Sequence, residues 1–299
     1  MSPPPSIPPL PTHHSLLTFL THYLPPTSIP DIPLLYHTPR FPNYSPSTSS
    51  ISHLLLALQP TPSLYTSLSR LHTAAFLHRP FGLDRRAIHR GNLVLASHKA
   101  FDSALTVGYN VHLAERLGMD IIEERGSLCV QGYKGDEERR IGIVGLVKTG
   151  VGFRGLVERI GGEFGGWEEV RWGGEGGLEV EREGAEIRVL AIMNAFHREE
   201  VRWVIDMAVE AGWIDGAEGG RRVLYLTGAA RPYGLEAVRE VGMTAVCVGH
   251  EACERWGIRF LAEKCRERWP GLDVKEIYED PEVEVRERNV EQSSNRERG

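Results

Sequence analysis

The stretch TAVCVGHEACERWGIRFLAEK (residues 244–264) shows most directly how this chain folds. Its first six residues form the short apolar run that is typical of a strand buried on both faces. His250 follows at once, and the helical segment that starts there is predicted to continue to residue 268. The stretch therefore predicts a buried strand that passes directly into a helix, with a histidine at the junction.

The same alternation of strands and helices extends outward from this stretch in both directions. Apolar runs predicted as further strands lie at residues 51–60, 74–77, 92–97, 139–147, 186–193, 221–228 and 272–278. Further helices are predicted at 15–24, after Pro60, and at 102–117, 199–211 and 235–241. Strands that alternate with helices favour an α/β sheet. Residues 142–184 contain 14 glycines and are predicted to form turns and a loop between two halves.

The composition restricts the class of protein. The chain has 299 residues, a net charge of −6 and 41% apolar residues, so one large or two modest soluble domains are expected. No run of about 18 apolar residues occurs, so we expect no membrane span. The mild acidity leaves no broad basic field, so nucleic acid is not an expected partner. Only four cysteines are present, which favours a reducing, cytoplasmic location, with the nucleus as the alternative.

The two ends of the chain differ from its middle. Residues 1–50 hold 13 of the 19 prolines and only two formal charges, Asp31 and Arg40. Their pattern indicates neither a signal peptide nor a mitochondrial presequence, so we expect none. Residues 1–12 are predicted to be a flexible Pro-rich segment. Residues 281–299 carry many charges and few apolar groups, so we expect a disordered tail.

Two other motifs suggest chemistry but have simpler explanations. GVGFRG (150–155) has the glycine spacing of a dinucleotide-binding turn, yet a chain with 32 glycines produces this pattern easily. We interpret it as a Gly-rich connection. Cys247, His250 and Cys253 resemble a zinc cluster, but Cys247 lies on a predicted strand and Cys253 on the next helix. Free cysteine is among the most buried residue types, so buried apolar thiols are the favoured interpretation.

A repeated pairing of histidine with a carboxylate is the stronger signal. SHKAFD (97–102) places His98 at the end of a strand and Asp102 four residues later, and GHEACE (249–254) does the same with His250 and Glu254. A spacing of four stacks two side chains on one face of a helix. His78 follows a third strand directly. Open α/β sheets bind ligands at the carboxyl ends of their strands.

These residues suit a particular kind of metal. Imidazole and carboxylate together favour Zn, Mn, Fe or Ni over calcium. The alternative is that the histidines are ordinary loop residues and that the acids offset the dipoles of helix N-termini. The residues alone leave the two interpretations about equally supported.

The sequence resembles the Nif-three-like family (NGG-interacting factor three), whose bacterial relatives are often labelled GTP cyclohydrolase type 2. The resemblance spans about residues 15–278 and is carried by LLLALQPT (54–61), LHRP (77–80), ASHKAFDSA (96–104), YNVHLAERLG (109–118) and the stretch 244–264. It implies an α/β fold of two interlinked lobes with mixed sheets. The expected Nif-three-like domain covers 13–280, with lobes at about 13–135 plus 220–280 and an insert at 136–219.

The resemblance also implies a metal site and an assembly. The family holds two divalent metal ions between its lobes, and many members form a toroidal hexamer. The positions that match metal ligands are His78, His98, Asp102, His250 and Glu254. We therefore expect a homo-oligomer that binds one or two divalent metal ions, or none where the site has degenerated.

The departures from the family pattern leave the catalytic status open. The second histidine of the family's H-H-P motif is Arg79, a permanent cation that cannot bind a metal. The family's T-G-D-x-x-H-H motif is replaced by TGAARPY (227–233). Two functions follow: a metal-dependent hydrolase similar to GTP cyclohydrolase type 2, or a non-catalytic interaction factor that binds a protein partner and keeps a degenerate metal site. No catalytic residue is predicted.

Overall fold

The computed structural model describes residues 9–25, 30–122, 126–148, 152–171 and 186–279. The predictions for the first eight residues and for 280–299 lie outside them. The chain divides into two compact units. Unit 1 comprises Met1–Leu20, Ile32–Ser97 and Leu261–Gly299, and unit 2 comprises Thr21–Asp31 and His98–Phe260.

Unit 1 contains a five-stranded sheet with the strand order β1-β4-β3-β2-β11. Its strands are β1 (Leu35–His37), β2 (His53–Ala57), β3 (Thr73–Leu77), β4 (Leu93–Ala96) and β11 (Asp273–Ile277). All neighbours pair in parallel except β1, which is antiparallel to β4. Because β3 lies at the centre, every one of its five residues is buried. This explains why the central strands have continuous apolar runs.

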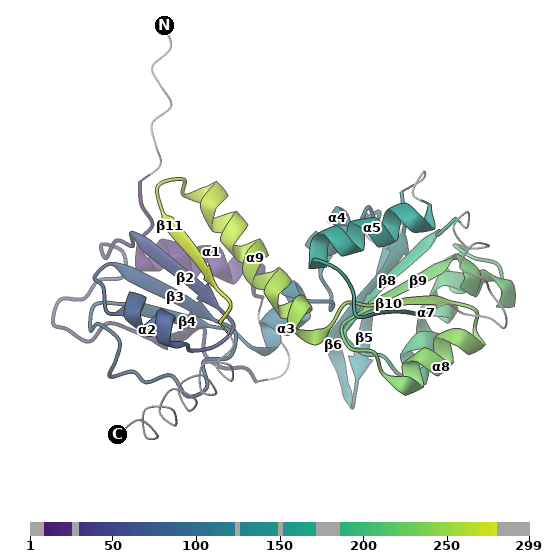
Figure 1. Cartoon of the computed structure of the whole chain (residues 1–299), viewed down its shortest axis with the longest axis horizontal. Helices are drawn as coiled ribbons and strands as arrows, with labels where there is room; N and C mark the ends of the chain where they lie inside the picture. Colours follow the sequence, from purple (N-terminus) through teal and green to yellow (C-terminus); the bar gives the residue numbers. More distant parts are fainter. Residues whose placement is uncertain (1–8, 26–29, 123–125, 149–151, 172–185, 280–299) are drawn as a thin grey trace, which may run out of the picture. The chain divides into compact units, whose positions relative to one another are not determined.

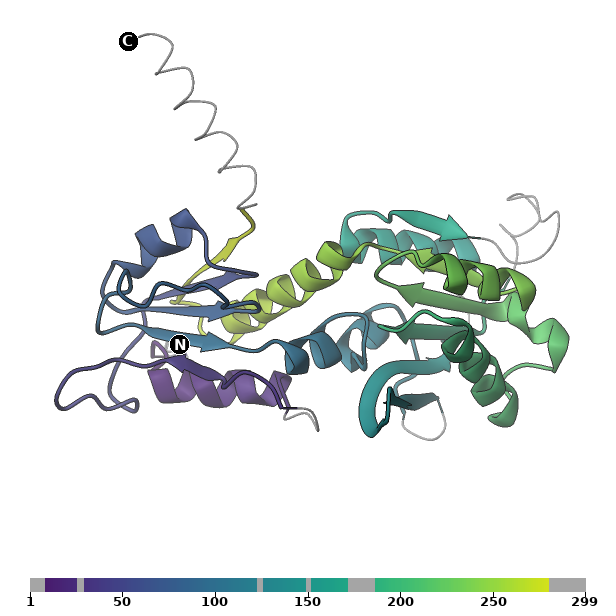
Figure 2. The same ribbon diagram turned by 90° about the horizontal axis from the view of Figure 1, so that it is seen from below.

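Helices cover both faces of this sheet (Figure 1). They are α1 (His13–Tyr23), α2 (Pro62–Leu68) and the second half of α9 (His250–Arg268). The α2 helix begins at Pro62 because Thr61 caps it, accepting a hydrogen bond from the backbone N–H of Leu64. Leu64 and Leu68 of α2 then pack with Leu55 and Leu77 of the sheet. The α1 and α9 helices lie on the other face (Figure 2).

Unit 2 contains a six-stranded mixed sheet with the order β5-β6-β8-β9-β10-β7. Its strands are β5 (Ser127–Tyr133), β6 (Asp136–Leu146), β7 (Glu169–Arg171), β8 (Val189–Met193), β9 (Val223–Thr227) and β10 (Thr244–Cys247). The strands β8, β9 and β10 are parallel, whereas β5, β6 and β7 each pair in the antiparallel sense. The β8–β9–β10 core has the parallel order that strand and helix alternation predicts.

The helices of unit 2 are α3 (Lys99–Leu105), α4 (Val111–Arg116), α5 (Phe153–Phe164), α7 (Arg198–Glu210), α8 (Pro232–Glu240), the short 3₁₀ helix η1 (Ala217–Arg222) and the first half of α9. Figure 1 shows α7 and α8 over one face of the sheet and α4 and α5 over the other. The buried cluster beneath α7 and α8 includes Tyr225, whose hydroxyl donates to the carbonyl of Ala195 at 2.6 Å. The α/β class with mixed sheets is confirmed.

The Gly-rich region departs from the prediction. It was expected to be turns and a loop, but residues 153–164 form α5 and residues 169–171 form β7. Phe153, Leu156, Val157 and Ile160 are buried on one face of α5. Their spacing is that of an amphipathic helix, a signal that the many neighbouring glycines obscured.

Two other boundaries differ. The helix expected at 102–117 is two helices, α3 and α4, because Asn110 starts a new helix, its side chain accepting a hydrogen bond from the backbone N–H of Leu113. The compact units also differ from the expected lobes, since residues 98–135 and 220–260 belong to the same unit as 136–219. The reason is that β6, from the expected insert, shares one sheet with β5 and β9.

The pairing of β6 agrees with the interpretation of GVGFRG as a connection. A dinucleotide-binding turn requires a strand, a helix and a second strand parallel to the first. The strand before this motif, β6, is antiparallel to both of its neighbours. Among the described residues, no helix has the length and apolar character needed to cross a membrane.

Two helical glycines are expected to respond in opposite ways to alanine. Gly162 in α5 has no atom near the position of an added Cβ, so Gly162→Ala should raise the free energy of unfolding by about 0.5–1 kcal/mol. An added Cβ at Gly234 in α8 would lie 2.5 Å from the buried ring of Phe196. Gly234→Ala should therefore lower the free energy of unfolding by about 1–3 kcal/mol. Urea titrations followed by circular dichroism measure the free energy of unfolding of both variants. If both variants are less stable than the wild type, the open surroundings of Gly162 are contradicted.

Candidate metal centre

The candidate metal centre is built at the carboxyl ends of β3 and β4. These strands are parallel neighbours, with Leu77 opposite Ala96, so the chain leaves both at the same edge of the sheet. His78 follows β3 directly, and His98 lies two residues after β4. The adjacency of the two strands therefore brings together two histidines that are 20 residues apart in the sequence.

Asp102 joins the two histidines through the first turn of α3. His98 is the N-cap residue of this helix, and its Nε2 lies 4.0 Å from Oδ2 of Asp102. Donor atoms of His78, His98 and Asp102 all lie within 4.8 Å of one another. His78 is fully buried, whereas the side chains of His98 and Asp102 are about one third exposed. The group thus combines one buried potential ligand, His78, with two that solvent can reach, His98 and Asp102.

The hydrogen bonds of His78 fit a role as metal ligand. Its Nδ1 lies 3.1 Å from the carbonyl oxygen of Ser97, which can only accept a hydrogen bond. Nδ1 of a neutral His78 therefore carries the proton, and its Nε2 keeps the lone pair that a metal needs. Histidine ligands commonly donate their other N–H to a backbone carbonyl in this way, which fixes both tautomer and ring orientation.

Ser97 itself adds a second observation. Its hydroxyl oxygen is buried and has no hydrogen-bond partner among the described residues. A buried hydroxyl of this kind has room for one more polar partner, and a water or an ion can provide it. Two histidines and a carboxylate are also a donor set that divalent transition metals favour.

His250 and Glu254 form the second histidine–carboxylate pair. His250 is the first residue of α9, and its Nε2 lies 3.2 Å from Oε1 of Glu254, as the spacing of four predicts. Its imidazole is 74% exposed, whereas Glu254 is 3% exposed. Among the described residues, the group of donor atoms within 4.8 Å of one another consists of His78, His98 and Asp102. His250 and Glu254 do not belong to this group. The strand before His250 is β10, which belongs to the six-stranded sheet and not to that of β3 and β4.

Three of the four cysteines are poor candidates for metal ligands. Cys247, Cys253 and Cys265 are buried and unpaired with one another, as the sequence predicts. Burial raises the pKa of Cys247 and of Cys265 to about 12 and that of Cys253 further. At neutral pH these thiols stay protonated, and only the thiolate binds metal well.

A cavity of about 530 Å³ escaped the sequence analysis. It lies in unit 2, beyond the carboxyl ends of β8 and β9, and its aromatic lining comprises Tyr133, His197, Trp203 and Tyr233. The rings of His197 and Tyr233 stack with their centroids 6.5 Å apart. The one signal in the sequence that could have indicated this cavity is the position of His197, shortly after an apolar run. Nothing in the sequence links His197 to Tyr233.

Comparison with known proteins gives structural but not sequence matches. No protein-family model matches the chain, and neither does any curated protein. HcgD from Methanocaldococcus jannaschii has a TM-score of 0.54 and 16% identity, covering 89% of this chain and 97% of its own. A Bacillus cereus protein related to NIF3 has a TM-score of 0.53 and 12% identity over 90% and 97% of the two chains. Protein YbgI, described as of unknown function, has a TM-score of 0.54 and 18% identity over 90% and 98%.

These similarities define the class of fold. The chain has a Nif-three-like α/β fold, and the expected resemblance is confirmed at the level of structure. The low identities agree with a divergent sequence. Within this fold, the group of His78, His98 and Asp102 could hold a metal ion.

Proposed function

We propose that this chain is a divalent-metal-binding protein whose metal is held by His78, His98 and Asp102. The observation that carries the proposal is the clustering of their donor atoms within 4.8 Å, together with the hydrogen bond that leaves Nε2 of His78 available. A metal at this position would supply Lewis-acid chemistry. The three side chains would bind and orient it, and the partial exposure of His98 and Asp102 would admit a small ligand.

Titration of untagged protein with Zn²⁺ and Mn²⁺, measured by calorimetry and by elemental analysis, tests the proposal. His98→Ala should weaken metal binding by about 100-fold or more, because loss of even an outer partner of a metal ligand costs 10–100-fold. His98 is partly exposed, so this variant should stay folded. His14→Ala removes an exposed histidine outside the group and is the matched control.

The outcomes of this titration are distinct. Absence of binding by the wild type, or equal binding by His98→Ala, would contradict the proposal. We propose His250 and Glu254 as further ligands on the strength of the sequence resemblance. His250→Ala tests them, since a loss equal to that of His98→Ala would extend the site to this pair.

Whether the metal serves catalysis is a second question. One candidate activity is hydrolysis of a nucleotide or another cyclic amide, as the GTP cyclohydrolase label of the family suggests. A second candidate, a non-catalytic interaction factor, is favoured by the segment after β9. Residues 228–233 hold neither an imidazole nor a carboxylate, and Tyr233 there is 69% exposed. Nucleotide-hydrolysis assays of the metal-loaded protein and of His98→Ala separate the two, since only the first predicts activity that the substitution removes.

A further inference from the structure

A second cavity lies at the opposite, amino-terminal ends of the parallel strands of unit 2. It has a volume of about 550 Å³, within the range of small-molecule sites. Four arginines line it: Arg188, Arg221, Arg222 and Arg239. They come from the segment before β8, the end of η1 and the last turn of α8. The cavity therefore collects positive charge from three separate parts of the chain.

Backbone contacts bring these segments together. The N–H of Arg188 donates to the carbonyl of Arg222 at 2.9 Å, which joins the entries to β8 and β9. Gly220 packs so closely on the carbonyl of Val241 that an added side chain would collide with it. Gly242 has a φ of +72°, and a Cβ added to it would lie 3.6 Å from Cγ of Arg221, so this part of the Arg221 side chain packs against the glycine. The position of the arginines is thus fixed by packed backbone, although their side chains reach solvent.

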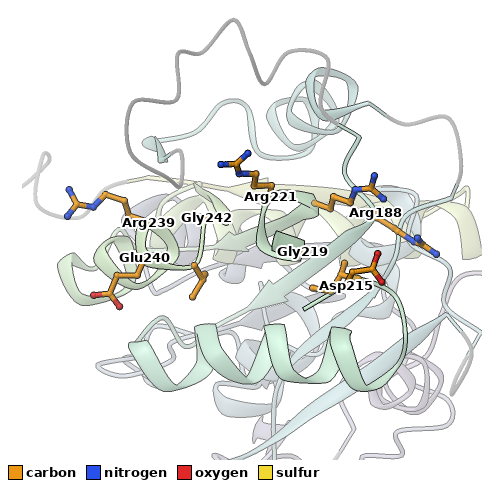
Figure 3. Close-up of a pocket in the computed structure, with 10 residues that line it drawn as sticks. Arg188, Asp215, Gly219, Arg221, Arg239, Glu240 and Gly242 are labelled. Atoms are coloured by element: carbon orange, nitrogen blue, oxygen red, sulfur yellow. The ribbon is translucent and has the colours of Figure 1, made fainter. Parts of the chain in front are cut away.

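The positive charge in the cavity is mostly uncompensated. Figure 3 shows Arg239, Arg221 and Arg188 spaced along the pocket, with Asp215 at the Arg188 end. The other acid of the lining, Glu240, already accepts two hydrogen bonds from Arg198, of 2.6 and 2.8 Å. None of the four arginines forms an ion pair with another described residue. Among the described residues, the lining therefore holds four guanidinium groups but only one carboxylate that is not already in an ion pair, Asp215, in a chain whose net charge is −6.

We propose that this cavity, the arginine pocket, binds a small ligand that carries several phosphate groups. The planar fork of arginine matches the oxygens of a phosphate and can donate two parallel hydrogen bonds. Four such forks spread over three segments suit a chain of phosphates better than a single anion. The site lies at the amino ends of β8, β9 and β10 and uses none of the candidate metal ligands, so it does not depend on the metal proposal.

Calorimetric titration of the full-length protein with sodium tripolyphosphate at low ionic strength tests the proposal. We expect saturable binding with a Kd below about 1 mM that weakens as NaCl is added. The double variant Arg221→Gln/Arg222→Gln should weaken it at least about tenfold, since each lost arginine removes charge-assisted hydrogen bonds. The control Arg154→Gln/Arg202→Gln removes the same charge from exposed positions of unit 2 outside the cavity and should change little.

Further ligands separate the sources of the phosphate. Binding of ATP as tight as that of tripolyphosphate shows that the phosphates suffice, and tighter binding shows that a nucleoside adds contacts; both support the proposal. Citrate that binds as tightly would overturn the preference for phosphate. The proposal also fails if tripolyphosphate does not saturate, or if the control double variant weakens binding as much as Arg221→Gln/Arg222→Gln. Unchanged circular dichroism of the variants verifies that they remain folded.

Discussion

Trp256→Ala is expected to lower the free energy of unfolding by about 3–5 kcal/mol, the typical result of removing a buried tryptophan. Trp256 is 1% exposed and stacks on Phe260, with ring centroids 5.2 Å apart and planes 10° apart. Its Nε1 donates to the carboxylate of Glu163 in α5 at 2.7 Å, and the guanidinium of Arg116 in α4 lies 5.6 Å from its ring. The residue therefore joins three helices of unit 2.

Two variants separate packing from hydrogen bonding at this position. Trp256→Phe keeps most of the buried ring but removes the donor to Glu163, so we expect a smaller loss of about 1–2 kcal/mol. Trp203→Ala removes a tryptophan of α7 that is 37% exposed and should cost clearly less than Trp256→Ala, because less apolar surface is buried there. Urea titrations followed by circular dichroism measure all three. If Trp256→Ala costs no more than Trp203→Ala, the structure is wrong about this contact.

Phe76→Ala is expected to have a similarly large effect in unit 1, about 3–5 kcal/mol. Phe76 is fully buried in β3, the central strand of the five-stranded sheet. Its neighbours in the paired strands, Leu56 and Leu95, are also buried, so the cavity left by the ring cannot be filled by solvent.

Phe81→Ala provides the matched control. Phe81 is 59% exposed and lies four residues after the end of β3, so its removal should change stability by no more than about 0.5 kcal/mol. Thermal unfolding by calorimetry suits this pair. Where the two units unfold in separate transitions, Phe76→Ala should shift one and Trp256→Ala the other. Equal effects of Phe76→Ala and Phe81→Ala would contradict the central position of β3.

The local parts of the candidate site could be predicted from the sequence. A buried apolar run followed by histidine places His78 and His98 at strand ends, and the spacing of four stacks His98 with Asp102 and His250 with Glu254. Both spacings depend only on the geometry of one helical turn. The structure shows the imidazole facing the carboxylate in each pair.

The grouping of these pairs could not be predicted, because it depends on which strands share a sheet. His78 and His98 meet because β3 and β4 are adjacent, whereas β10, before His250, lies in the other sheet. Periodicity and composition indicate that a segment is a buried strand, but not which strand lies beside it. The Gly-rich region shows a related failure, since the helix at 153–164 was hidden by its composition.

The sequence by itself therefore determined most of the central buried strands, most of the helices that follow them and the histidine–carboxylate pairs at two of their junctions. Only the tertiary structure decided which side chains meet. The arginine pocket illustrates the reason, because residues 188, 221, 222 and 239 follow no common spacing and come together through backbone contacts at the entries to three strands. Local geometry repeats with a fixed period and is visible in the sequence, whereas contacts between distant segments depend on the order in which strands pair.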